Sequence, residues 1–173
     1  MALRDIIILP DNILKRSSEG FANVDAEVRD LASDMFDTMY EAPGIGLAAV
    51  QIGLLKRMIV VDVAREEQPR EPLCLINPKI VWSSPEVSEY EEGCLSIPEV
   101  YDLVERPSEI KVQYLDQQGA ECERHCEGLL STCVQHEIDH LNGVLFIDHL
   151  SRLKRDRVIK KFVKAAKQNE VNA

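Results

Sequence analysis

The stretch Gln135-His136-Glu137-Ile138-Asp139-His140-Leu141 places two histidines four residues apart, with a glutamate next to the first. An α-helix turns once every 3.6 residues, so both imidazoles project from one face, where they can hold one metal ion with Glu137 beside it. Apolar side chains surround the same segment, which is typical of a buried helix. With Gly128 near its start and Asn142-Gly143 after it, the sequence predicts a helix over about 128–141.

Two histidines supply half of a tetrahedral site, so a third protein ligand is needed, and a catalytic site leaves the fourth position to water. His149 lies nine residues after His140, beyond the predicted end of the helix, and is a poor candidate. Cys94 is a better one, because the preceding Gly93 frees the backbone to present a side chain from a loop or strand end. The sequence therefore favours a metal site made of Cys94, His136 and His140.

Length and composition limit the class of protein. The chain has 173 residues, 45% of them hydrophobic, and we expect a single domain over residues 1–173. No apolar run approaches the roughly 18 residues of a membrane span, and the first residues do not resemble a signal peptide, so we expect a cytoplasmic protein. The five cysteines are interpreted as reduced thiols and ligands rather than as a disulfide framework. The net charge of −10 argues against nucleic-acid binding by the whole surface.

Local patterns predict the other elements. Residues 6–9 predict a short strand or extended arm buried on both faces, and Asp25 caps a helix that extends to about residue 41. Strands are expected at 58–63, 73–76, 79–82, 110–116, 120–126 and 144–147. The glycine-rich stretch 44–53 matches no phosphate loop, and its small residues indicate a close backbone approach to either a packed neighbour or an extended substrate.

A last helix, predicted at about 150–168, carries most of the positive charge. Its expected apolar side consists of Leu153, Ile159, Phe162, Val163 and Ala166. Residues 152–167 hold eight Lys or Arg and one Asp, a net charge of +7, against −17 for the rest of the chain. Such a helix is usually a solvated face, and the functional alternative is an arm that docks on an RNA surface.

Three motifs together resemble the signature motifs of the peptide deformylase family. In chain order they are Gly44-Ile45-Gly46-Leu47-Ala48-Ala49-Val50-Gln51, Glu92-Gly93-Cys94-Leu95-Ser96 and Gln135-His136-Glu137-Ile138-Asp139-His140-Leu141. The resemblance extends from Pro10-Asp11 to the basic C-terminal helix and so covers essentially the whole chain. It implies an α+β fold in which antiparallel β-sheets wrap around a central buried metal-binding helix, with an N-terminal helix and a C-terminal helix.

The resemblance also implies an activity and its residues. The family removes the formyl group from the N-terminal formyl-methionine of nascent chains and releases formate. Its metal is Fe(II), which zinc, nickel or cobalt can replace, and the implied ligands are the three named above. Glu137 would be the acid/base for the metal-bound water that attacks the formyl carbon, and the Gln51 side chain with the Leu95 amide would form the oxyanion hole. A zinc-type metalloprotease and a structural metal-binding protein are the alternatives.

Further positions follow from helix geometry and from the family pattern. The predicted methionine pocket consists of Ile45, Tyr90, Leu129, Thr132 and Cys133. Residues Gly44, Ile45 and Gly46 would pair with the substrate backbone as an added strand. Many bacterial members have an Arg near the substrate mouth where this chain has Tyr101, so the contacts to later substrate residues are left open.

The last expectations concern support and partners. The family pattern suggests that Asp139 pairs with Arg106 beside the metal ligands. Strand alternation places His125 on the face opposite Cys122 and Cys126, which argues against a second metal site there. We expect a monomer that acts on N-formylmethionyl nascent peptides and that reaches the ribosome through its basic helix.

Overall fold

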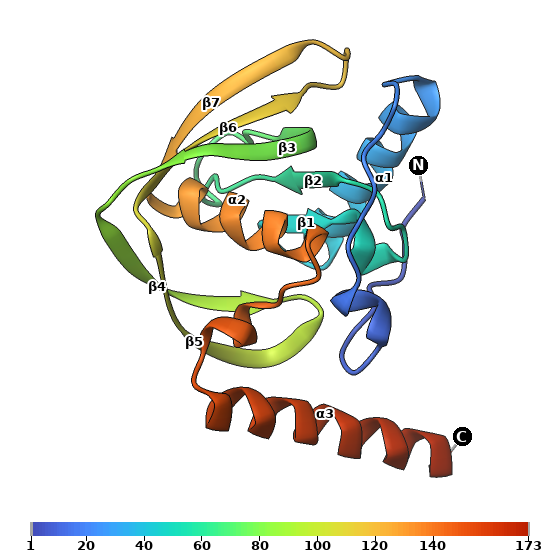
Figure 1. Ribbon diagram of the computed structural model, residues 1–173. Helices are drawn as coiled ribbons and strands as arrows, with labels where there is room; N and C mark the ends of the chain where they lie inside the picture. The colour runs from blue at the N-terminus through green and yellow to red at the C-terminus, as the bar shows by residue number, and fades with distance from the viewer. Residues whose placement is uncertain (1, 173) are drawn as a thin grey trace.

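Helix α2 (Gly128–Leu141) lies between two antiparallel sheets in the computed structural model, which describes residues 2–172 (Figure 1). The larger sheet has the strand order β1-β2-β3-β6-β7, with bounds Gly46–Ala48, Met58–Val61, Leu73–Ser83, Glu109–Leu115 and Glu121–Glu127. The smaller sheet is a hairpin of β4 (Val87–Cys94) and β5 (Ile97–Pro107). With α1 (Ala26–Glu41) and α3 (Arg152–Asn172) outside the sheets, this α+β architecture confirms the expected fold class.

Helix α2 is buried on most sides, and its bounds are those that the sequence predicts. Val134, Ile138 and Leu141 pack in one core with apolar residues of β2, β3 and β6. Complete burial of such a side chain contributes roughly 1.5–3 kcal/mol. The chain turns sharply after the helix at Gly143, whose φ is 74° and where a Cβ would collide with the Lys15 carbonyl, so glycine is required there. Packing from both sheets therefore fixes the position of α2.

Helix α1 covers the β1 and β2 side of the larger sheet. The Asp25 carboxylate accepts a hydrogen bond from the Val28 backbone N–H at 3.1 Å, which confirms the predicted N-cap. Val28, Ala32, Met35 and Met39 pack in a second core with buried residues of β1, β2 and β3. The helical spacing of these apolar residues thus corresponds to a core face, as predicted.

The β4–β5 hairpin is the main element that the sequence does not predict. Its register is antiparallel, with Glu89 opposite Glu105 and Glu91 opposite Leu103. The odd-numbered residues 87–91 and 101–105 are exposed, whereas the even-numbered ones are partly or fully buried. The hairpin therefore has an inner face toward α2 and an outer face toward solvent.

The strand predicted at 144–147 is wrong, and residues 6–9 form the extended arm that the sequence gives as the alternative to a strand. Residues 6–9 form an extended segment outside both sheets, in which Leu9 is buried but Ile8 is 46% exposed, so the segment is not buried on both faces. Residues 144–147 do not form a strand, because the 3₁₀ turn η3 (Phe146–His149) begins inside them. The apolar run has a different role, since Phe146 and Ile147 fill a third core beneath the hairpin. A four-residue apolar run cannot distinguish these outcomes.

The other strands agree with expectation, with one change. The segments predicted at 73–76 and 79–82 form one strand, β3, in which the register shifts between Ile76 and Lys79. Asn77, at this irregularity, has a φ of 50°, a left-handed value that Asn tolerates. The shift interrupts the alternation, which explains why the sequence suggests two strands.

Helix α3 lies beyond the hairpin, on the side away from the larger sheet (Figure 1). Phe162 is buried in the third core with Val158 and Ile159 beside it, whereas Leu153 is 71% exposed and does not belong to the expected apolar side. Among residues 2–172, no helix is long and apolar enough to cross a membrane.

Candidate active site

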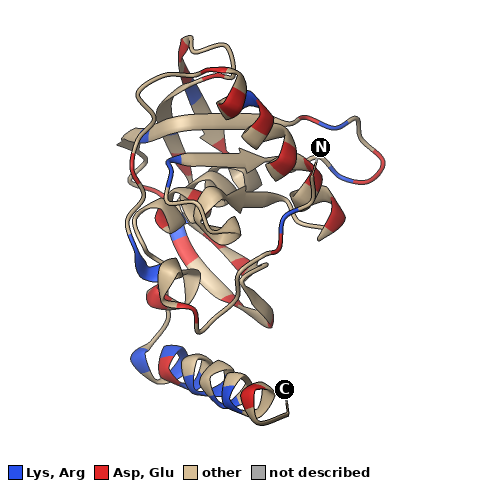
Figure 2. Ribbon diagram, turned by 90° about the vertical axis from the view of Figure 1, so that its right-hand side faces the viewer, with Lys and Arg blue, Asp and Glu red and all other residues tan. Residues whose placement is uncertain are grey.

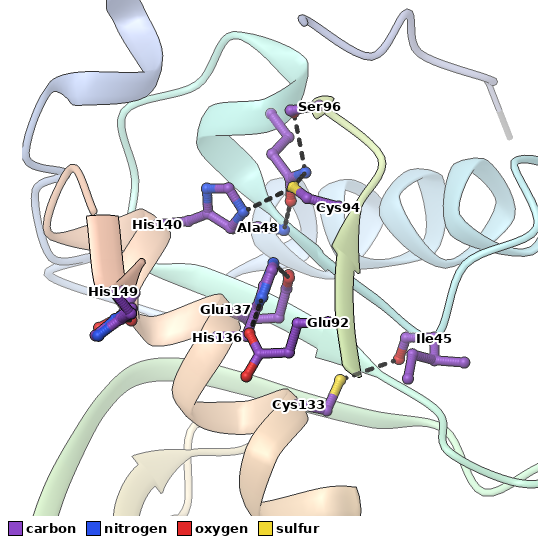
Figure 3. A network of polar contacts seen from close by, with 12 residues as sticks. Ile45, Ala48, Glu92, Cys94, Ser96, Cys133, His136, Glu137, His140 and His149 are labelled. Carbon is purple, nitrogen blue, oxygen red and sulfur yellow. Dashed lines mark hydrogen bonds and ion pairs between the residues drawn. The ribbon is translucent and has the colours of Figure 1, made fainter. Parts of the chain in front are cut away.

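Helix α2 and the end of β4 bring the three predicted ligands together. The imidazole centroids of His136 and His140 lie 5.1 Å apart, and the Cys94 Sγ lies 3.3 Å from the His140 Nε2. One ligand atom from each of the three residues lies within 4.8 Å of the others, as Figure 3 illustrates. Cys94 thus meets two histidines that follow it by 42 and 46 residues in the sequence.

The geometry of this cluster fits a tetrahedral metal ion. Nitrogen and sulfur ligands at about 2.0–2.3 Å from one ion lie roughly 3.3–3.6 Å apart, which agrees with the contact between Cys94 and His140. The His136 Nδ1 donates to Glu92, so its Nε2 is left for a metal. Among the described residues, no fourth His, Cys or carboxylate joins the cluster. The site can therefore hold an ion and leave one position open, as catalytic sites do.

A buried ionic network supports the first histidine. Glu92 accepts hydrogen bonds from the His136 Nδ1 at 2.9 Å and from Arg106, whose Nε lies 2.7 Å from the carboxylate. Arg106 also donates to Asp139 at 2.8 Å, which confirms the predicted pair. Asp139 in turn contacts the His149 Nε2 at 2.8 Å, so the partly exposed His149 completes a chain of contacts from the surface to the metal ligand.

Glu92 is a functional residue that the sequence analysis missed. Burial alone would raise the pKa of Glu92, but hydrogen bonds from His136 and Arg106 outweigh burial and hold the pKa below its usual value. The residue is therefore an acceptor that fixes the ring of His136. The sequence carries no clear signal for this role, because the inward positions of β4 are polar and a carboxylate is unexpected on a buried strand face.

Glu137 faces the metal cluster from inside the protein (Figure 3). Its Oε1 lies 3.5 Å from the His136 Nε2, and its Oε2 has no hydrogen-bond partner among the described residues. Burial raises the pKa of Glu137 to about 7, although the nearby His136 opposes the rise. A buried carboxylate with a free oxygen and a pKa near neutrality is suited to accept and return a proton.

Gln51 is oriented toward the same cluster. Its Oε1 accepts a hydrogen bond from the Ala48 backbone N–H at 2.9 Å, which fixes the direction of the amide. Its Nε2 lies 3.1 Å from the Ser96 Oγ and 3.6 Å from the Cys94 Sγ. The amide donors therefore point at the ligand cysteine. Leu95, the next residue after Cys94, lines the adjacent cavity.

A cavity of about 670 Å³ opens in front of the cluster. Its walls include Ile45, Leu129, Thr132 and Cys133, as predicted, whereas Tyr90 is not among its lining residues. The hydroxyl of Tyr90 lies instead beside Gly128, at the start of α2. Burial raises the pKa of the Cys133 thiol well above its usual value, so the thiol stays neutral and forms part of an apolar wall. Four of the five predicted pocket residues thus come together.

The glycine-rich stretch lies along one side of the cavity. Gly44, Ile45 and Gly46 all line it, and β1 is the edge strand of the larger sheet. A Cβ on Gly46 would lie 2.9 Å from the Cys133 Sγ and 3.0 Å from the Glu137 Cγ, so glycine allows β1 to approach α2. The same edge faces the cavity, where an extended chain can be added. The small residues therefore allow both a close approach to a packed neighbour, α2, and a close approach to an extended substrate.

Within residues 2–172, Cys122, His125 and Cys126 do not form a cluster with metal-ligand distances. Cys126 is buried, Cys122 contacts Asp116, and His125 pairs with Glu109 at 3.1 Å.

A Cys-His-His cluster with an open position, a buried carboxylate and an apolar cavity together define a metal-dependent hydrolase. A sequence model of the polypeptide deformylase family matches residues 3–156. The chain therefore belongs to the polypeptide deformylase family, whose members are metalloenzymes.

Relatives and solved structures agree with this assignment. The chain is 57% identical to a peptide deformylase of Rhizobium meliloti, over 100% of this chain and 99% of the relative. It is 61% identical to a peptide deformylase of Methylocella silvestris, over 96% and 87% of the two chains. The crystal structure of peptide deformylase from Ehrlichia chaffeensis superposes with a TM-score of 0.91 at 44% identity, over 97% of this chain and 99% of that one. The same enzyme is known in complex with actinonin, with a TM-score of 0.90 at 46% identity, over 95% and 98% of the two chains. These comparisons support neither a metalloprotease nor a structural metal protein.

Proposed function

We propose that this deformylase-family hydrolase releases formate from the N-terminal formyl-methionine of nascent polypeptides, with a metal ion held by Cys94, His136 and His140. The observation that carries the proposal is the contact of the Cys94 Sγ with the His140 Nε2 at 3.3 Å, at the end of an apolar cavity and beside Glu137, whose Oε2 has no hydrogen-bond partner within residues 2–172. When bound, the ion supplies Lewis acidity that makes water a better nucleophile near neutral pH and polarises the formyl group.

The side chains of this chain then move the protons. Glu137 accepts a proton from the attacking water through its free carboxylate oxygen. As negative charge develops on the formyl oxygen, the Gln51 side-chain NH₂ and the Leu95 backbone N–H donate to it, and each such donor is typically worth about 3 kcal/mol. Glu137 returns the proton to the departing nitrogen as the bond between carbon and nitrogen breaks. The products are formate and a peptide with a free methionine amine.

The cavity positions the substrate for this reaction. The methionine side chain occupies the apolar space between Ile45, Leu129 and Cys133, near Thr132. The substrate backbone pairs with Gly44 to Gly46 along the edge of β1. Near-attack positioning of this kind accounts for a large share of enzymatic rate enhancement.

We propose Fe(II) as the cellular metal, with zinc, nickel or cobalt able to occupy the same ligands. Affinity alone favours zinc over iron, so cellular supply decides which ion is loaded. Metal analysis of protein prepared without oxygen tests this directly, and an iron content below that of zinc would contradict it. The Fe(II) form should also lose activity in air faster than a nickel form, because the ion and the Cys94 thiolate can both be oxidised.

We also propose that α3 holds a monomeric, cytoplasmic enzyme near the ribosome. Figure 2 displays the basic residues gathered along this helix, while acidic residues are spread over the rest of the protein. Residues 152–167 carry a net charge of +7 and the remainder −17, so this helix is the part of the surface that a polyanion attracts.

Charge reversal tests this docking without removing the helix. Arg157, Lys160, Lys161 and Lys164 are exposed and make no ion pair within residues 2–172, so their replacement by Glu should leave the buried Phe162 in place. Co-sedimentation with ribosomes should be lost in this variant and should weaken steeply with salt in the wild type. Changing the three lysines to Arg is the matched control and should retain binding. Unaltered binding of the Glu variant would mean that α3 is a solvated face.

The activity itself is tested with formyl-Met-Ala and with the same peptide lacking the formyl group. Formate release from the first and no internal cleavage of the second are expected. Cleavage of the unformylated peptide would favour a protease.

A further inference from the structure

We propose that the outer face of the β4–β5 hairpin extends the substrate cavity and binds basic side chains of the nascent peptide several residues beyond the formyl-methionine. The inference rests on the proposed deformylase function and deepens it by naming a class of preferred substrate. The residues that define the outer face here are Glu89, Glu91, Tyr101, Leu103 and Glu105.

These side chains form a continuous track that begins at the cavity. In the antiparallel register, Gly93 lies opposite Tyr101, Glu91 opposite Leu103, and Glu89 opposite Glu105. Glu91 and Tyr101 line the cavity that also contains Glu137. Successive pairs on one face are about 6.6 Å apart, so the Glu89–Glu105 pair lies about 13 Å along the strands from Tyr101, the length of roughly four extended residues. A substrate that fills the cavity can therefore reach the whole track.

The track carries negative charge that is not neutralised by an ion pair within residues 2–172. Glu89 and Glu105 are both exposed and are directly opposite each other. Like charges in this arrangement destabilise a sheet, because the two Cβ atoms are only about 5 Å apart. Within residues 2–172, no Lys, Arg or His side chain forms an ion pair with Glu89, Glu91 or Glu105. A cationic side chain of a substrate would relieve this repulsion, whereas an acidic one would increase it.

Two exposed apolar side chains complete the track. Tyr101 is 66% exposed and Leu103 is 53% exposed. The Tyr101 ring lies on Gly93, where a Cβ would clash with it, so the absence of a side chain at Gly93 keeps the ring at the cavity mouth. Lys and Arg have long aliphatic stems that pack on apolar surface, and their charged ends are attracted to aromatic faces and carboxylates. The combination of these features matches a basic residue rather than a purely apolar one.

Kinetic specificity tests this assignment. Three peptides, formyl-Met-Ala-Lys-Ala-Lys and its analogues with Ala or Glu in place of both Lys, are compared at about 0.01 M and about 0.5 M salt. At low salt, kcat/KM for the Lys peptide should exceed that for the Glu peptide by about tenfold, and the difference should lie in KM. At high salt the ratio should approach unity, because these charges are exposed and screened.

Matched variants separate the track from the general charge of the protein. The double variant Glu89→Gln/Glu105→Gln should lower the Lys-to-Glu ratio to about threefold or less. The variant Glu66→Gln/Glu67→Gln changes the net charge equally, at exposed positions in a loop that does not line the cavity, and should keep the wild-type ratio. Removal of the facing carboxylates should also raise the Tm, so a lower ratio cannot be attributed to unfolding.

The possible results separate a failure of the proposed basic-residue preference from a failure of the proposed deformylase function. Equal kcat/KM values for the three peptides in the wild type, or a ratio unchanged by the Glu89 and Glu105 substitutions, would overturn this inference alone. Absence of formate release from all three peptides would overturn the proposed function and this inference with it.

Discussion

Glu92 accepts a hydrogen bond from the His136 Nδ1 at 2.9 Å while Arg106 holds the same carboxylate with its Nε at 2.7 Å. Arg106 therefore fixes the Glu92 carboxylate, and the carboxylate fixes the ring of His136. The Nε2 of His136 is directed at the other two ligands, Cys94 and His140. Metal affinity should depend on residues that never touch the ion.

The variant Glu92→Gln tests this dependence. The amide cannot neutralise the buried Arg106, so stability should fall by about 3 kcal/mol. Because the ring of His136 also loses its carboxylate partner, metal affinity should fall about 10–100-fold. Competition with a chelator measures the affinity, and urea unfolding measures the stability. Glu86→Gln, the same substitution at an exposed site, is the control. Unchanged metal affinity in the Glu92 variant would show that the ring of His136 needs no support.

Glu137→Gln should retain the metal and lose nearly all turnover, because the amide preserves the shape of the side chain but cannot accept a proton. General acid–base catalysis contributes about 10²–10⁴-fold, so kcat should fall by at least about 100-fold. Formate release and metal content are measured on the same sample. A kcat within about tenfold of the wild type would exclude Glu137 as the base.

Cys94→Ser should weaken metal binding strongly, because a neutral hydroxyl replaces a thiolate. The control is Cys122→Ser, on β7, which lies outside the cluster and the cavity and should keep the wild-type metal content. Metal content after dialysis is the measurement. If the Cys94 variant retains both metal and activity, the third ligand is another residue.

The fold outside the metal site also depends on one charged group, Asp62. Burial would raise the pKa of Asp62, but hydrogen bonds from the Tyr40 hydroxyl at 2.6 Å and from the backbone N–H groups of Ala64 and Glu71 lower it overall. A depressed carboxyl pKa stabilises the protein above the unfolded pKa of about 3.9, and this stabilisation is lost as pH falls through the folded pKa.

Tyr40→Phe should therefore be less stable at pH 7 by about 1.5–3 kcal/mol, because a hydrogen bond to a charged group is lost. The difference from the wild type should shrink as pH falls from about 4 through the lowered pKa of Asp62, because the carboxyl is then protonated in both proteins. The contact of Arg70 with the ring, at 4.0 Å from its centroid, can persist in the variant. Urea unfolding at several pH values measures the effect, and a difference that does not depend on pH would contradict it.

The sequence predicts the parts of this protein whose residues follow a regular period. The helices α1 and α2 have apolar residues at helical spacing, and the ligand pair His136 and His140 follows from the same period. Cys94 could be proposed because few other residues were available as a third ligand. The helices and the histidine pair depend on residues that are close in the sequence, so a local pattern is sufficient to predict them.

The hairpin could not be predicted because its inner face is polar. Ser88, Tyr90 and Glu92 occupy the inward positions of β4, so the apolar alternation of a strand is absent. Among the described residues, the charge on Glu92 is satisfied by Arg106 and His136, which lie 14 and 44 residues away. Tyr90 does not line the cavity, because it lies on this unpredicted hairpin, with its hydroxyl beside Gly128. Long-range polar pairing determines this region, and a single sequence does not reveal it.

The most direct test of the account is formate release from formyl-Met-Ala by the Fe(II)-loaded protein, measured before and after removal of the metal by a chelator. Formate release should disappear on chelation, return on addition of Fe(II) or nickel, and be absent with unformylated Met-Ala. Undiminished formate release from protein shown to be free of metal would contradict the central claim that Cys94, His136 and His140 hold a catalytic ion.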